Sequence, residues 1–76
     1  MRADICDPED HLGAEKFRQV LRELEATLVS SDRGFGVEVR TFQIDNETFS
    51  VFGDTWSIDI EGSEHVVRKI LEAYRG

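Results

Sequence analysis

The segment Cys6–His11 brings a thiol, several carboxylates and an imidazole close together, and all of these can bind metal. A transition-metal site normally takes ligands from separated parts of a chain, and with one cysteine and two histidines this chain has no second pair to complete one. Asp7 followed by Pro8, then Glu9 and Asp10, is typical of a helix N-terminus, where carboxylates favour the positive end of the dipole. We therefore predict a helix start here and no metal site.

A second group of reactive side chains lies between the last predicted strand and the last predicted helix. A carboxylate such as Asp59 or Glu64 would orient His65 as a general base. No nucleophilic side chain can be assigned to this histidine from the sequence. The sequence also has no nucleotide-binding loop, nucleophile elbow or zinc-binding helix motif. We therefore predict that the protein is not an enzyme, with no catalytic residues and no cofactor. The alternative is a site for a small ligand or a divalent cation at this junction, which would allow an enzymatic function.

The distribution of charge gives a stronger indication. The chain has a formal net charge of −7, and no lysine or arginine occurs between Arg40 and Arg68. Complementary charge speeds the encounter of two proteins and disfavours wrong partners, so we predict binding to a basic protein surface. Direct binding to nucleic acid or to an anionic membrane is not expected, because phosphate attraction requires a basic patch. The residues predicted to bind the partner are Asp45, Glu47, Phe52, Asp54 and Asp59.

The pattern of apolar residues predicts an α+β fold with two layers in the order αβββα. The first helix ends near Val29 or Ser30 and is followed by a turn at 30–34; the second begins after Ser63, its cap. Three β-type runs between them form an antiparallel three-stranded meander, and both helices pack on its apolar face. The predicted strands are 36–44, 47–52 and 55–61.

Two-residue turns set the expected register of this meander. A turn at Asp45–Asn46 pairs Phe42 with Phe49, and a turn at Gly53–Asp54 pairs Val51 with Trp56, which puts Trp56 in the core. Phe52 points to the opposite, open face. Val37 and Val39 have the wrong parity for the core, which predicts either a bulge near Arg40 and Thr41 or an outward-facing apolar pair, and we favour the bulge.

Length and composition favour one domain over residues 1–76, with 1–7 flexible. The chain has no apolar run long enough for a membrane helix and a single cysteine, which favours a cytoplasmic protein, either a monomer or a homodimer joined through the edge of the first strand. The element order resembles that of double-stranded-RNA-binding domains. Those domains use a basic cluster at the start of the second helix, whereas this chain has Ser63, Glu64 and His65 there.

Overall fold

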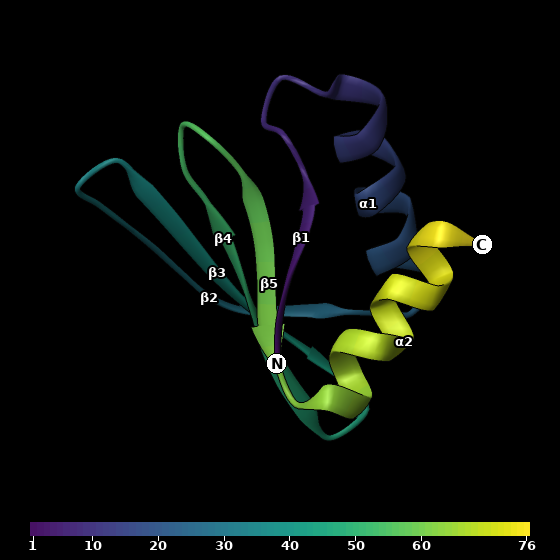
Figure 1. Ribbon diagram of the computed structural model, residues 1–76. Helices are drawn as coiled ribbons and strands as arrows, with labels where there is room; N and C mark the ends of the chain where they lie inside the picture. The colour runs from purple at the N-terminus through teal and green to yellow at the C-terminus, as the bar shows by residue number, and fades with distance from the viewer.

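The computed structural model describes all residues, 1–76, as one small α+β domain. It contains a five-stranded antiparallel sheet in the strand order β1-β5-β4-β3-β2, with both helices on one side (Figure 1). The α+β class is confirmed, and the predicted three-stranded meander is present as β3, β4 and β5, but it is only part of the sheet, because one further strand lies at each edge. The elements in chain order are β1 (Arg2–Cys6), α1 (His11–Glu23), β2 (Thr27–Gly34), β3 (Val37–Ile44), β4 (Glu47–Gly53), β5 (Ile58–Gly62) and α2 (Glu64–Arg75).

Strand β1 occupies the segment that was expected to be flexible. It pairs antiparallel with β5, with Ala3 opposite Ile60 and Asp4 opposite Asp59. Ala3 and Ile5, two positions apart, share the face that packs against the core, and the pairing has a bulge between Asp4 and Cys6. A stretch this short gives little periodic signal, and only its partner, distant in sequence, makes it a strand.

Helix α1 is shorter than predicted at both ends. It is capped by Asp10 rather than Asp7, because Asp10 Oδ1 accepts a 2.8 Å hydrogen bond from the backbone of Gly13. At the other end Glu25 has a φ of 57°, a left-handed conformation that stops the helix. The residues predicted to continue the helix and then turn, 27–34, form β2 instead.

The turn after β2 lies at Phe35 and Gly36, which have φ values of 53° and 78°. Two positive φ values in a two-residue hairpin are the type I′ geometry, whose twist matches that of the flanking strands. Phe35 is fully exposed at this tip.

The predicted register of β3 and β4 is confirmed, with Phe42 opposite Phe49 and Ile44 opposite Glu47. The bulge favoured in β3 is wrong: its pairing with β4 is continuous, and Val39 faces away from the helices, opposite Phe52. The turn between β4 and β5 is also longer than predicted. Gly53 pairs with Ile58, so the side chain of Trp56 lies in a loop, 82% exposed, and not in the core.

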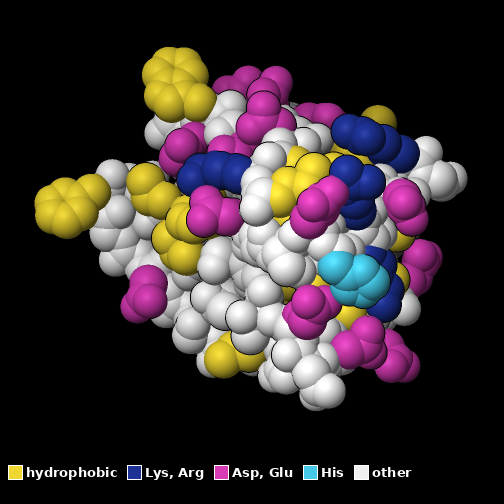
Figure 2. Space-filling view, turned by 60° about the horizontal axis from the view of Figure 1, so that its bottom comes forward, with side chains coloured by type: hydrophobic (Ala, Val, Ile, Leu, Met, Phe, Trp, Pro, Cys, Tyr) yellow, Lys and Arg dark blue, Asp and Glu magenta, His cyan; other side chains and the backbone are white.

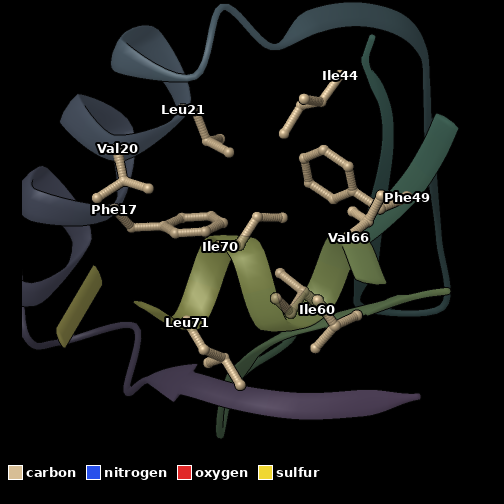
Figure 3. Close-up of a cluster of buried hydrophobic side chains, with 10 residues drawn as sticks. Phe17, Val20, Leu21, Ile44, Phe49, Ile60, Val66, Ile70 and Leu71 are labelled. Carbon is tan, nitrogen blue, oxygen red and sulfur yellow. The ribbon is translucent and has the colours of Figure 1, made fainter. Parts of the chain in front are cut away.

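The core lies between the helices and the strands β4 and β5, with Ile44 from the end of β3 (Figure 3). Helix α2 buries Val66, Val67, Ile70 and Leu71, whereas Leu12 in the first turn of α1 is exposed. The ten buried residues are Phe17, Val20, Leu21, Ile44, Phe49, Ile60, Val66, Val67, Ile70 and Leu71.

The helices cover only part of the sheet. Their contacts are mainly with each other and with β1, β4 and β5, while every residue of β2 is exposed. In Figure 1 the hairpin of β2 and β3 accordingly stands away from α1. Neither α1 nor α2 has the length and the apolar character that a membrane-spanning helix needs.

Candidate functional site

The sheet face turned away from the helices, here called the open face, carries the most distinctive arrangement of side chains. A row crosses all five strands through paired positions: Asp32 is opposite Val39, Val39 opposite Phe52, Phe52 opposite Asp59, and Asp59 opposite Asp4. Two apolar side chains therefore lie at the centre of the row with carboxylates on both sides. Since residues of one parity share a face, this placement follows from the strand register.

The adjacent row on the open face is polar. Ser30 is opposite Thr41, Thr41 opposite Ser50, and Ser50 opposite Glu61, which pairs with Arg2. Hydroxyl groups both donate and accept hydrogen bonds. The open face thus combines a small apolar centre with a border able to satisfy polar groups of a partner.

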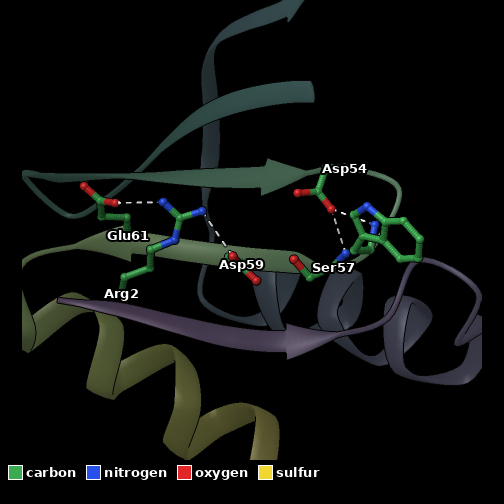
Figure 4. Close-up of polar contacts among 6 residues, drawn as sticks. Arg2, Asp54, Ser57, Asp59 and Glu61 are labelled. Atoms are coloured by element: carbon green, nitrogen blue, oxygen red, sulfur yellow. Dashed lines mark hydrogen bonds and ion pairs between the residues drawn. The ribbon is translucent and has the colours of Figure 1, made fainter. Parts of the chain in front are cut away.

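Arg2 lies across this face (Figure 4). Its Nη2 is 3.1 Å from Asp59 Oδ2 and its Nη1 is 3.4 Å from Glu61 Oε2. Its guanidinium carbon is also 4.6 Å from the centre of the Phe52 ring, within cation–π range. The Arg2 side chain is half exposed, and it is the cationic side chain of β1 that contacts the carboxylates of β5.

Asp59 and Asp4 form a pair of facing carboxyl groups next to Arg2. Burial acts to raise the pKa of Asp59, but hydrogen bonds from Asp4 and Arg2 outweigh it, so its pKa lies below the ordinary value. The pKa of Asp4 is raised, first by its hydrogen bond to Asp59, then by the charge of Asp59 and by burial. Asp59 Oδ1 is buried and accepts no hydrogen bond from an amide, guanidinium or hydroxyl group. Asp4, opposite Asp59 in the sheet, can donate to Asp59 in acid, when its own carboxyl group is protonated.

Two of the predicted partner-binding residues, Asp45 and Glu47, lie elsewhere, around the turn between β3 and β4. Asp45 Oδ2 is 3.2 Å from Lys69 Nζ, and Glu47 Oε1 accepts a 3.2 Å hydrogen bond from the hydroxyl of Ser63. Both contacts join the sheet to α2, so these carboxylates serve local structure. On the side shown in Figure 2, acidic side chains are accordingly scattered among basic ones and do not gather into one patch.

Asp54 lies at the opposite end of β4, roughly 20 Å away for a strand of seven residues. Its Oδ1 accepts hydrogen bonds from the backbone of Trp56 at 2.7 Å and of Ser57 at 2.8 Å (Figure 4). This side chain shapes the loop between β4 and β5. Of the five predicted residues, the structure therefore brings together only Phe52 and Asp59.

The junction between β5 and α2, considered above for proton transfer or cation binding, contains one weak pair. His65 Nε2 lies 3.9 Å from Glu47 Oε2, and the His65 side chain is 77% exposed. Ser63 caps the helix, with its hydroxyl accepting from the backbone of Val66. No group of three or more His, Cys, Asp or Glu side chains converges here or elsewhere in the chain.

The residues that sequence reasoning missed are Arg2 and Asp4, because β1 was not recognised. Their alternation with Ala3 and Ile5 is the only signal that could have placed them on a sheet face.

No family model, curated protein sequence or solved structure matches this chain. Its function has to be inferred from the open face itself.

Proposed function

We propose that the protein is a non-catalytic interaction module that binds a basic protein surface through the open face. The observation that carries this proposal is the row in which Val39 and Phe52 are neighbours and carboxylates lie at either side. An apolar centre with a polar rim is the usual anatomy of a protein interface. Neither helix packs on this face, so it is accessible to a partner (Figure 1).

The charge of the open face indicates which kind of partner it would bind. Four carboxylates, those of Asp4, Asp32, Asp59 and Glu61, lie on the open face with the single guanidinium of Arg2. A lysine- or arginine-rich protein surface complements this set and is steered toward it. Nucleic acid and anionic membranes are repelled by the same carboxylates, so we propose neither as a partner.

The proposed module acts in the cytoplasm, as a monomer or homodimer, which fits a small chain with one free cysteine.

Phe52 is the proposed anchor, because aromatic side chains supply large contact areas at interfaces. Asp59 lies directly opposite it on β5. Asp45, Glu47 and Asp54 contribute to the overall negative field of the chain, but not to this contact.

The test compares two variants that remove the same number of charges. The double variant Asp32→Asn/Glu61→Gln changes the open face, and Asp45→Asn/Glu47→Gln changes the turn near α2. Each protein is used at low salt to capture partners from the source cell, and the proteins released by salt are identified and then titrated singly.

We expect basic proteins to be retained by the unmodified chain and released by salt. The open-face variant should bind them about tenfold more weakly, since two charge contacts at the rim are lost. The turn variant should bind within about twofold of the unmodified chain. Equal weakening by both variants, or an interaction insensitive to salt, would contradict the proposal.

A further inference from the structure

A groove of about 710 Å³ lies on the other side of the sheet, between α1 and the helix-facing surface of β3 and β4. It exists because the helices leave this part of the sheet uncovered. Its apolar lining comes from two walls, with Phe17 and Leu21 on α1 and Phe42, Val51 and Ile58 on the sheet. The volume is within the range of small-molecule sites, which is about 300–1,000 Å³.

The groove is unusually basic for this chain. Arg18 and Arg22 line it from α1, one helical turn apart, and Arg40 lines it from β3. A chain with nine basic and sixteen acidic residues thus places three arginines around one apolar groove. Arg18 pairs with Glu15 and Arg40 with Glu38, whereas Arg22 has no ion-pair partner.

The two carboxylates that line the groove are already engaged. Glu38 receives a 2.8 Å hydrogen bond from Arg33 and also pairs with Arg40. The hydrogen bond from Arg33, with the charge of Arg40, keeps the pKa of Glu38 below its ordinary value despite burial. Asp54 Oδ1 is occupied by the backbone of its own loop. Arg22 is therefore available to an incoming anion.

We propose that this groove binds a small amphipathic carboxylate, with the head group at Arg22 and the apolar body along Phe17, Phe42 and Val51. Arg40, which is paired with Glu38, adds positive charge from the opposite wall. Guanidinium groups bind carboxylates by paired hydrogen bonds, and aliphatic chains are favoured on apolar linings. A helical peptide is a poorer fit, because a helix is about 10–12 Å across and two turns of it would exceed the volume of the groove. This inference is independent of the proposed protein partner, which uses the opposite face of the sheet.

The test uses three ten-carbon compounds that differ only in the head group: decanoate, decylamine and decanol. Decanoate and decylamine are titrated below their critical micelle concentrations and decanol below its solubility limit, with binding followed by calorimetry and by amide shifts in the protein NMR spectrum. We expect saturable binding of decanoate, with shifts concentrated at 17–22 and 38–42. Decylamine and decanol should bind at least about tenfold more weakly, the difference made by one charge-assisted hydrogen bond.

Arg22→Gln should weaken decanoate binding about tenfold, and Arg40→Gln, from the opposite wall, should also weaken it. The matched control is Arg75→Gln, which removes the same charge from the last turn of the other helix and should change nothing. Absence of decanoate binding, equal affinity for the three compounds, or equal weakening by Arg75→Gln would each overturn the proposal.

Discussion

The guanidinium of Arg2 in β1 lies 3.1 Å from the carboxylate of Asp59 in β5, although the two residues are 57 positions apart in sequence. The same guanidinium lies over the ring of Phe52. One side chain from the edge strand therefore both neutralises the nearest carboxylate and shields the aromatic group at the centre of the open face. Removing the Arg2 side chain should therefore lower the stability of the domain while raising its affinity for a basic partner.

The variant Arg2→Gln should unfold at a lower temperature than the unmodified chain, because Asp59 would then face Asp4 without a neighbouring cation. The same variant should bind a basic partner more tightly, because the open face becomes more negative and Phe52 is uncovered. Thermal denaturation and a binding titration on one sample check both effects. Arg75→Gln is the charge-matched control, and weaker binding by Arg2→Gln would contradict the assignment of the site.

The pair Asp4 and Asp59 predicts a distinct dependence of stability on pH. The raised pKa of Asp4 means that its stabilising contribution is present in acid and is lost as pH rises through that pKa. The lowered pKa of Asp59 means that its contribution is present above the ordinary carboxyl pKa and is lost as pH falls through its own. Their combined contribution is therefore greatest in the acidic interval between the two pKa values.

The variant Asp4→Asn keeps a hydrogen-bond donor beside Asp59 and removes the like charge. It should have a higher melting temperature than the unmodified chain at pH 7, and this gain should disappear below about pH 4, where Asp4 is protonated in both states. Melting curves between pH 3 and pH 8 measure the effect. A gain that stays the same over this whole range would show that the two carboxyl groups do not interact.

Gly62 is closely packed where β5 passes Phe49. A Cβ at this position would lie 3.0 Å from Phe49 Cβ and 3.4 Å from the carbonyl oxygen of Thr48. Gly62→Ala should therefore lower the free energy of unfolding by about 1–3 kcal/mol, the usual cost of overpacking. Denaturant unfolding measures it. Gly53→Ala is the control, since nothing lies within 4 Å of a Cβ there, and an equal loss in both variants would exclude the contact with Phe49 as the cause.

Local patterns were sufficient to predict the second helix and the hairpin that joins β3 to β4. The apolar spacing from Val66 to Leu71 gives one buried face, and Asp45 tolerates the left-handed conformation that its turn needs, with a φ of 56°. In these segments the local preference and the tertiary environment favour the same structure.

The first half of the chain was harder to predict because two signals compete there. Leu24 and Leu28 continue the helical spacing of Leu21, while Thr27 and Val29 favour a strand. Pairing with β3 stabilises the strand, and the positive φ of Glu25 reverses the direction of the chain after α1. Such a choice depends on the completed sheet and cannot be read from nearby residues.

The candidate site, like the fold, was predicted from the sequence only in part. Alternation along the strands was enough to place Phe52 on the open face, whereas its neighbour there, Val39, was missed because a bulge was favoured. The position of Arg2 depended on recognising β1, and the arginine-lined groove depended on how far the helices extend over the sheet. Neither relationship is encoded in a local motif.

The sheet also implies an order of assembly for the chain. Strands β2 to β5 follow one another through short hairpins, so each forms at a low entropic cost, whereas β1 must close a loop that contains almost the whole chain before it pairs. We expect β1 to dock last. Until it does, the flank of β5 stays unsaturated, and during that interval a nascent chain is most vulnerable to pairing with a foreign strand.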